Sequence, residues 1–448
     1  MATKHDGAAG ELLRILGIGF GLAVVVGAVV GQGIMRTPGI VAGALPSEAW
    51  VLGAWALGGL VILIDACATV ELGASVPRSG GPYVFAARAF GPTAGAMLGW
   101  ADALNYILGM SYVSVVFAEY AQRLGIGTML PTGALAILLI AVLGAINWTG
   151  TRTSGRSQIV GSALKGAGLT LLVLVLWLMP ARSGSATAAA AHALPPLLTI
   201  AAIGTAMRAV AITYGGWNAA IYCSEEMCQP ERSIARVTFG GILMVILLFL
   251  AVNGALFHVL SREQIAASNL PVADATAAVL GSASGKVITL LAIIAVVTIC
   301  NVMVMFVSRI VFAMARNGIL PSFLTRVSKS GTPRLALLCS TVIAAFLAST
   351  GSYERLIAIG APFLIGVPAV TDLAAIAMRI REPGLERPFK MPLFPLPALL
   401  GFAVNALLVG AIFYEDPFDS SLGIGLVVLV GIATGIHGRL TLRRAAAA

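Results

Sequence analysis

Charged residues are scarce in this 448-residue sequence: Asp, Glu, Lys and Arg make up 10% of it, whereas apolar residues make up 58%. An average soluble protein carries about 25% charged residues and about 45–50% apolar ones. A single soluble domain cannot bury such an excess of apolar side chains, and the net charge of +9 is not gathered in one basic patch. The composition therefore excludes a soluble globule, a disordered chain and a nucleic-acid-binding protein, and it indicates a multi-pass membrane protein.

Cysteine and histidine are also rare, with five and four residues respectively. The cysteines lie in or beside apolar runs and have neither metal-ligand spacing nor the pattern of a secreted disulfide framework. The histidines are scattered, and no GxxxxGK[ST] phosphate-binding loop is present. The sequence therefore predicts no metal site, no catalytic residues, no cofactor and no ATP-driven activity.

Long apolar runs occupy most of the chain. About 20 apolar residues are needed for a helix to cross the hydrocarbon core of a membrane. On that measure the sequence predicts twelve spans, near 14–42, 49–72, 93–121, 129–147, 156–179, 197–224, 237–260, 286–314, 335–350, 355–378, 394–414 and 420–438. The expected fold class is an all-α integral membrane protein.

Lys and Arg are distributed unevenly between alternate loops. Twenty of the 28 lie at the N-terminus or in the segments near 73–92, 148–156, 225–236, 309–334, 379–390 and 439–448. Positively charged loops stay in the cytoplasm. We therefore expect both termini to be cytoplasmic, in the cell (inner or plasma) membrane, with the first apolar run retained in the mature protein.

Two of the predicted spans contain paired glycines at mid-depth. The first span contains VVGQGIMRTPG, with Gly31 and Gly33 on either side of Gln32, and the sixth contains ITYGGWNAA, with Gly215 and Gly216 adjacent. Glycine weakens a helix by about 1 kcal/mol relative to alanine. Matched interruptions five spans apart are typical of an inverted five-plus-five repeat with broken helices at the binding site. The alternative is close helix packing around small residues.

The inverted repeat would divide the chain into five parts. These are a tail at 1–13, a first repeat of helices 1–5 at 14–180, a second repeat of helices 6–10 at 196–379, helices 11–12 at 391–438, and a tail at 439–448.

Broken helices expose backbone groups that suit a zwitterion. Free N–H groups at a helix start near Gln32 and Gly33 suit a carboxylate. Free carbonyl groups at the other helix ends suit an ammonium group, and the sequence places them near Val29, Ile212, Thr213 and Gly215. Backbone alone could therefore bind the common part of an α-amino acid.

Several longer motifs resemble a known family. VGQGIMRTPG, VELGASVPRSGGPYVFAARAFGP, NWTGTRTSGRSQIVGSALK, ITYGGWNAAIYCSEEMCQPERSIAR, SRIVFAMARNGILP and REPGLERPFKMPLFP are similar to motifs of the amino acid–polyamine–organocation (APC) superfamily, above all its L-type amino acid transporter branch and related bacterial permeases. The resemblance implies a LeuT-type fold of twelve helices and alternating-access transport. It implies a substrate site at Val29, Gly31, Gln32, Gly33, Ile212, Thr213, Gly215 and Trp217, although Trp217 could serve packing alone.

The sequence departs from this family at positions that affect selectivity. Gln32 stands where a smaller residue is usual, and Ile212 stands where an aromatic lid is common. Arg36 and Arg208 add positive charge on the outer halves of the broken helices. With no acidic side chain next to either break, we expect a neutral, small-to-medium L-amino acid as substrate. The alternative is another organic amine, a cationic amino acid or a polyamine.

Lys165 is a cation within the predicted fifth span. It could extend its stem back to the headgroups. The family resemblance implies instead that it stands near the inner half of span one, where sodium binds in sodium-coupled relatives, and could tie helix five to the carbonyl groups near Gly27. Loss of its proton would then release that half-helix, so Lys165 is the predicted coupling residue.

Other charged residues fall inside spans or at their ends. Asp65 and Asp372 are each either a proton site or a carboxylate satisfied by a neighbouring helix. The acidic residues at the cytoplasmic span ends, for which an Arg-paired or solvated state is expected, are Glu71, Glu225 and Glu226. Arg78 and Arg232 are the candidate partners for an inner gate.

The function that these patterns favour is a secondary transporter for amino acids, working as an exchanger or as a proton-coupled symporter. A channel would need a ring of like residues, and a membrane enzyme would need a nucleophile–base or metal constellation. The oligomeric state is left open. Animal L-type relatives attach a second subunit through a cysteine after span three; residues 121–130 contain none here, so no disulfide-linked subunit is expected.

Overall fold

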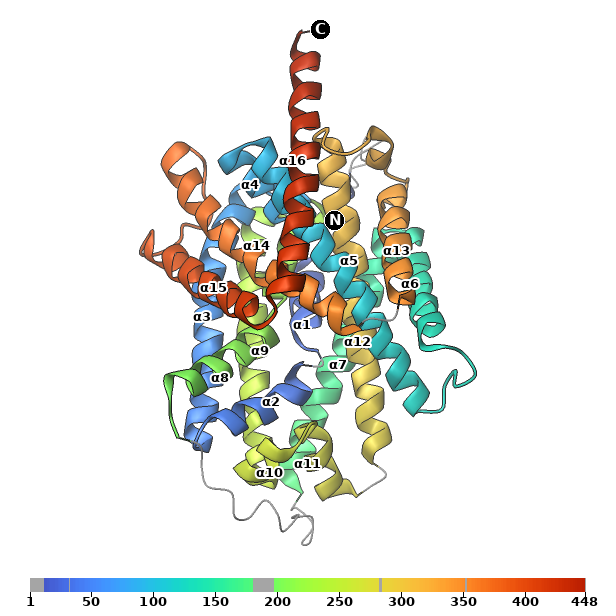
Figure 1. The fold of residues 1–448 in the computed structure, drawn as a ribbon, viewed down its shortest axis with the longest axis vertical. Coiled ribbons are helices and arrows are strands. Elements are labelled where there is room, and N and C mark those ends of the chain that lie inside the picture. The colour runs from blue at the N-terminus through green and yellow to red at the C-terminus, as the bar shows by residue number, and fades with distance from the viewer. Residues whose placement is uncertain (1–11, 32, 180–196, 282–283, 351–352, 448) are drawn as a thin grey trace.

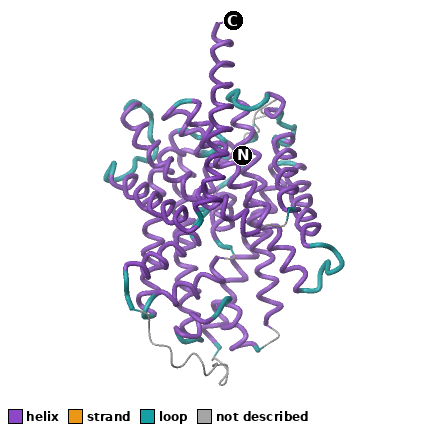
Figure 2. Tube along the Cα trace, viewed as in Figure 1, coloured by secondary structure: helices purple, strands orange, loops and turns teal. Residues whose placement is uncertain are grey.

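The computed structural model describes residues 12–31, 33–179, 197–281, 284–350 and 353–447. Within these ranges the chain forms helices joined by short loops and contains no β-strand (Figures 1 and 2). The elements are α1 (Ile18–Val29), α2 (Gly33–Ala44), α3 (Glu48–Ser75), α4 (Pro82–Phe90), α5 (Pro92–Arg123), α6 (Thr132–Thr149), α7 (Thr151–Leu178), α8 (Ile200–Thr213), η2 (Trp217–Glu226), α9 (Pro230–Val259), α10 (Arg262–Ala267), α11 (Pro271–Leu280), α12 (Ser284–Arg316), η3 (Ser322–Thr325), α13 (Arg334–Ser349), α14 (Tyr353–Arg381), α15 (Leu396–Glu415) and α16 (Pro417–Ala447).

Many of these helices are long and apolar enough to cross a membrane. Among the described residues nine qualify singly, and α1 with α2, which meet at a bend of 48°, make a tenth if they are counted as one span. The apolar helix α13 has 16 residues, and α8 has 14. The structure therefore confirms an all-helical integral membrane protein, while the total of twelve spans stays a prediction.

Proline sets the starts of several helices. It occupies the first or second position of α4, α5, α9, α11 and α15. Proline is favoured there because its fixed φ suits a helix and its missing N–H would have no helical partner anyway. Short loops between the helices result, as between α4 and α5, where a single glycine, Gly91, makes the turn with φ +95°.

Helix α1 lies inside the bundle. It packs against α7, α9, α12 and η2, and Phe20, Val24 and Val25 are among its buried residues. A helix that is apolar on all sides is typical of such a position. The first interrupted helix is therefore surrounded by protein, and its break lies deep inside the molecule.

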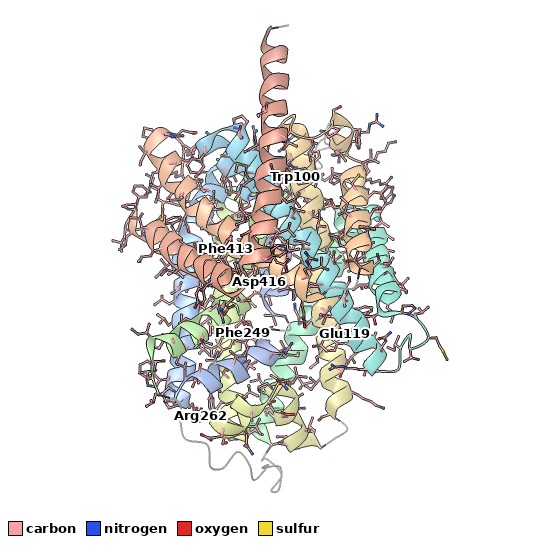
Figure 3. The ribbon with its side chains drawn as sticks, viewed as in Figure 1. Trp100, Glu119, Phe249, Arg262, Phe413 and Asp416 are labelled. Carbon is pink, nitrogen blue, oxygen red and sulfur yellow. The ribbon has the colours of Figure 1, made fainter. Side chains whose placement is uncertain are left out.

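The two ends of the bundle differ. Helix α4 and the C-terminal end of α16 lie at one end, and α10 and α11 lie at the other (Figure 1). Figure 3 places Arg262 at the second end, where its guanidinium donates to the Ala42 carbonyl oxygen (2.9 Å) and fixes the end of α2. We assign the first end to the cytoplasm on the basis of the Lys and Arg count, and this orientation stays a prediction.

The segment between α14 and α15 is held to the bundle by Glu71 at the end of α3. The Glu71 carboxylate contacts the guanidinium groups of Arg387 (3.1 Å) and Arg379 (3.3 Å), and it accepts from the Met391 N–H (2.6 Å). The expected Arg-paired state of Glu71 is thus confirmed. In the same region Arg88 forms an ion pair with Glu382 (2.6 Å), and the Arg88 hydrogen bonds hold the pKa of the half-buried Glu382 below its usual range.

Candidate functional site

Both predicted breaks are present. Helix α1 ends at Val29, and the next helix begins at Gly33. Helix α8 ends at Thr213, and the 3₁₀ helix η2 begins at Trp217 after a turn in which Gly216 has φ +95°. Only glycine adopts that conformation without steric cost. The glycine pairs therefore interrupt the helices as the sequence predicts.

The two breaks face each other. The hydroxyl groups of Thr37 on α2 and Thr213 on α8 are joined by a hydrogen bond of 2.7 Å. A Cβ atom at Gly33 would lie 3.0 Å from the Thr213 methyl carbon, and one at Gly216 would lie 3.1 Å from the Ala28 carbonyl oxygen. The start of α2 thus packs on the end of α8, and the end of α1 packs on the start of η2.

A cavity of about 520 Å³ lies at the breaks. Seven of the eight residues predicted for the substrate site line it, namely Val29, Gly31, Gly33, Ile212, Thr213, Gly215 and Trp217. The eighth, Gln32, lies outside the described residues. The cavity thus brings together backbone from both interrupted helices.

One predicted backbone ligand differs from expectation. The Ile212 carbonyl oxygen accepts a hydrogen bond from the Gly215 N–H (3.1 Å), because the chain closes one more turn after α8. The prediction that this carbonyl is free is therefore wrong. Ile212 still lines the cavity.

Two carboxyl groups line the same cavity, Asp65 on α3 and Asp102 on α5. Asp102, which the sequence analysis missed, is buried, and its Oδ1 atom accepts from the Tyr222 hydroxyl (3.0 Å). Its Oδ2 atom has no hydrogen-bond partner in the part of the chain that the structure describes. An ionisable residue within an apolar span is the signal that could have found it. No acidic residue lies next to the breaks in the sequence, but Asp65 and Asp102 lie on the wall of the cavity in the structure.

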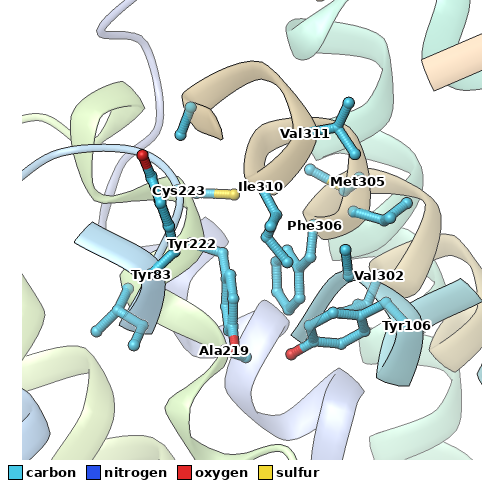
Figure 4. Packing of buried hydrophobic residues seen from close by; sticks show 14 of the residues in the cluster. Tyr83, Tyr106, Ala219, Tyr222, Cys223, Val302, Met305, Phe306, Ile310 and Val311 are labelled. Carbon is cyan, nitrogen blue, oxygen red and sulfur yellow. The ribbon is translucent and has the colours of Figure 1, made fainter. Parts of the chain in front are cut away.

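Three aromatic rings form one wall of the cavity. The Tyr222 ring on η2 stacks on the Phe306 ring of α12 (4.7 Å between centroids, 18°), and the Tyr106 ring of α5 meets both edge-on (5.3 and 5.6 Å). Figure 4 shows these rings packed with Val302 and Ile310. This aromatic layer lines the cavity beside η2.

A buried ion pair lies beyond the aromatic layer. Glu226 follows Tyr222 by four residues, and its carboxylate receives two hydrogen bonds of 3.0 Å from the Arg309 guanidinium on α12. The Thr151 hydroxyl also donates to this carboxylate (3.0 Å). The side chains of Arg309 and Glu226 are 1% and 0% exposed. This second layer is buried and fully ion-paired.

The charges at this end are paired differently from the prediction. Arg309 was assigned to the cytoplasmic segment near 309–334, but it lies within α12, seven residues before the helix ends. Arg78 and Arg232 were the predicted gate partners, whereas Glu226 pairs with Arg309 and Glu225 pairs with Arg316 (2.8 Å). Glu225 and Glu226 pair with arginines of α12 because α12 packs directly against η2.

The chain before α1 is joined to the end of η2. The Leu16 N–H donates to the Glu226 carbonyl oxygen (2.9 Å), and the Cys228 N–H donates to the Leu16 carbonyl oxygen (2.8 Å). These bonds make an isolated parallel bridge between Leu16 and Met227. The start of the first broken helix and the end of the second are therefore held together.

Lys165 lies behind the first break and outside the lining of the cavity. Its side chain is 1% exposed, and its ammonium group donates to the Gly27 carbonyl oxygen in the last turn of α1 (2.8 Å). One turn earlier on α7, the Ser162 hydroxyl donates to the Ala23 carbonyl oxygen (2.6 Å). Lys165 therefore binds α1 and does not extend to the headgroups.

The two arginines on the outer halves of the broken helices are in different states. Arg208 forms an ion pair with Glu415, at the end of α15, and Arg36 is exposed. The Glu415 carboxylate therefore offsets the positive charge of Arg208 near the cavity.

Membrane-length helices around a cavity between two interrupted helices define a membrane transport protein. The profile of the amino acid permease family matches residues 21–435. The chain therefore belongs to the amino acid permease family, within the L-type amino acid transporter branch of the APC superfamily. It is an amino acid transporter and not an enzyme.

Individual relatives cover nearly the whole chain. The serine/threonine exchanger SteT of Bacillus subtilis (strain 168) is 26% identical over 97% of this chain and 97% of its own length. The human Asc-type amino acid transporter 1 is 27% identical over 94% of this chain and 81% of its own length. The human large neutral amino acids transporter small subunit 2 is 27% identical over 96% of this chain and 81% of its own length.

Proposed function

We propose that this protein transports neutral L-amino acids of small to medium size across the cell membrane by alternating access, as an exchanger or as a proton-coupled symporter. The observation that carries this proposal is the pair of helix breaks facing each other across the cavity of about 520 Å³. The relatives named for serine and threonine exchange and for large neutral amino acids support the substrate class.

The zwitterion would be held by backbone groups. The N–H groups at the start of α2, from Gln32 and Gly33 onward, would bind the carboxylate, because a helix start carries a partial positive charge. The carbonyl groups of Val29, Thr213 and Gly215 would bind the ammonium group. Gly31 gives the substrate room beside the break, and Trp217 and the Ile212 side chain form walls.

Alternating access needs a closed layer on one side at a time. The aromatic layer of Tyr106, Tyr222 and Phe306 and the Glu226–Arg309 pair supply closure at the end of η2. Lys165, through its bond to Gly27, would couple the movement of α1 to α7. We place this mechanism in a LeuT-type arrangement of twelve spans, with repeats at 14–180 and 196–379 and both termini in the cytoplasm.

The first prediction concerns substrate choice. In proteoliposomes loaded with serine, external alanine, serine, threonine and leucine should drive counterflow of labelled serine with saturation, whereas lysine and arginine should compete at least about tenfold less well. The zwitterion site fits all of them, but each cavity carboxyl already accepts a hydrogen bond on one oxygen, Asp102 from Tyr222 and Asp65 from Asn405, so neither offers a fully free carboxylate to a cationic side chain.

Protein-free liposomes are the control for this assay. Competition by lysine or arginine that exceeds that of serine would overturn the neutral-substrate proposal and favour the cationic alternative. Dissipation of label without saturation would indicate a channel.

The second prediction concerns Gln32, between the two glycines of the first break. Gln32→Ser should change the ranking of substrates in the same counterflow panel by about tenfold for at least one amino acid, because the shorter side chain removes bulk and an amide from the proposed site. Gln264→Ser, in the capping box of α10, is the matched control and should keep the wild-type ranking. A Gln32→Ser ranking equal to wild type would place Gln32 outside the substrate site.

A further inference from the structure

Two buried carboxyl groups face each other between three helices. Asp65 on α3 and Asp372 on α14 are 3% and 0% exposed. The amide nitrogen of Asn405 on α15 lies 3.3 Å from Asp65 Oδ2 and 3.5 Å from Asp372 Oδ2. The Asn405 amide thus bridges the two carboxyl groups. The sequence predicts Asp65 and Asp372 as two separate candidates, whereas the structure places them side by side.

The two carboxyl groups have fewer hydrogen-bond donors around them than two carboxylates would need. Asp65 Oδ1 and Asp372 Oδ1 are buried and have no hydrogen-bond partner among the described residues. No Lys, Arg or His of the described chain forms an ion pair with either group. A single amide cannot satisfy two carboxylates.

Most other charges near these helices are already paired. The remaining titratable group beside Asp65 is the Cys67 thiol, which donates to the Leu63 carbonyl oxygen (3.4 Å). Among the charged groups on the helices packed against the pair, those with ion-pair or hydrogen-bond partners are Glu71 with Arg379 and Arg387, Glu415 with Arg208, Glu382 with Arg88, Asp419 with Arg355, Glu225 with Arg316, Glu226 with Arg309, and Asp102 with Tyr222. Glu48, Glu119 and Glu354 lie at or near the ends of α3, α5 and α14. Helix α9 carries no Asp, Glu, Lys or Arg between residues 237 and 259.

The pair opens on the substrate cavity. Asp65, Asn405 and Gly401 line the cavity, and Asp372 lies behind them. Gly401 lets α15 pack directly against the pair: a Cβ atom there would lie 2.7 Å from Asp65 Oδ1 and 2.8 Å from Asp372 Oδ2. Because Asp65 lines the cavity, a proton can reach the pair from the space that the substrate occupies.

Two adjacent buried carboxyl groups without a counter-ion cannot both be ionised, so they share at least one proton. We propose that Asp65 and Asp372 form a proton-binding site on the wall of the substrate cavity, which takes up one further proton when the cavity is open to the acidic side and releases it on the other. A neutral amino acid brings no net charge to offset the remaining negative charge, so the closed cavity favours the doubly protonated pair. This inference rests on the proposed function, since it makes the proton a co-substrate of a neutral amino acid.

The test uses the full-length protein in proteoliposomes that contain a pH-sensitive dye. With an acidic exterior, the wild-type protein should accumulate serine several-fold more than without a pH gradient, and serine addition should acidify the interior. Asp65→Asn and Asp372→Asn both imitate the protonated acid in shape. Asp372→Asn, at a position behind the cavity lining, should keep serine exchange at equal pH within about twofold of wild type. Both variants should lose the effect of the gradient and the acidification.

Asp419→Asn, at the Arg355 ion pair, is the matched control and should keep the gradient effect. An unchanged gradient effect in both pair variants would overturn the proton site, as would wild-type exchange with no acidification. Loss of lysine exchange alone in Asp65→Asn would also overturn it, because the pair would then bind a substrate cation. Failure of wild type to exchange any neutral amino acid would overturn the proposed function instead.

A second measurement covers variants that do not insert into the membrane. A hydrophobic carbodiimide reacts with protonated carboxyl groups, so mass spectrometry of the treated wild-type protein should find Asp65 or Asp372 labelled, more at acidic than at alkaline pH. Excess serine should slow labelling of Asp65, since Asp65 lines the substrate cavity. No label on either residue at acidic pH would overturn the proposal.

Discussion

Lys165→Ala is expected to bind substrate as the wild-type protein does and to lower net uptake by roughly 10- to 100-fold. The ammonium group donates to the Gly27 carbonyl oxygen at 2.8 Å, and both lie away from the lining of the cavity. A hydrogen bond to a charged group contributes about 1.5–3 kcal/mol to the state that contains it. Without it the inner half of the first span loses its attachment to α7, while the backbone groups at the breaks are unchanged.

The pH profile of uptake is the second readout for Lys165. We expect charged Lys165 to hold α1 and loss of its proton to release α1, so the residual exchange of Lys165→Ala should vary less with pH than wild-type uptake does. Binding and uptake are measured in proteoliposomes from about pH 5 to about pH 8. Lys286→Ala, an exposed lysine near the start of α12, is the control. Normal uptake and an unchanged pH profile in Lys165→Ala would show that the lysine has no coupling role.

Arg309→Met is expected to have the largest effect on stability. It leaves the Glu226 carboxylate, which is 0% exposed, without its guanidinium partner. Breaking a buried ion pair by removing one partner costs about 3–5 kcal/mol, because a charge stays buried and unpaired. In detergent solution the thermal midpoint of Arg309→Met should fall far below that of wild type.

Two controls separate charge from packing. The double variant Arg309→Met with Glu226→Gln should recover much of the stability, since no uncompensated charge remains. Arg355→Met, which breaks the exposed pair with Asp419, should change stability by less than about 1 kcal/mol. A thermal midpoint of Arg309→Met equal to that of Arg355→Met would contradict the role assigned to the buried pair.

The sequence predicts the site well wherever a local residue type determines the backbone. Paired glycines permit a break but do not force one, because α3 and α9 each contain an adjacent glycine pair and are continuous. Both breaks and most of the cavity lining could be predicted because the pairs at Gly31/Gly33 and Gly215/Gly216 recur at matched positions five predicted spans apart. The partner of Lys165 could be predicted only through the family resemblance, because Gly27 is 138 residues away in sequence.

The residues that sequence reasoning missed depend on which helices meet. Arg309 looks like a loop cation because it lies near the end of an apolar run, yet α12 continues to Arg316 and buries it against η2. Asp102 gives no local signal of its partner Tyr222, 120 residues away. Asp65 and Asp372 become a pair only because α3, α14 and α15 converge.

The bridge between Leu16 and Met227 limits how the two broken helices can move. A typical hydrogen bond contributes about 0.5–1.5 kcal/mol net, so separating the start of α1 from the end of η2 costs roughly 1–3 kcal/mol for the two bonds. At equilibrium, states in which one of these ends moves without the other are then rarer than joint states by a factor of about 5 to 150. The start of α1 and the end of η2 therefore move together. A spectroscopic label near Leu16 should report the motion of η2 as well as that of α1.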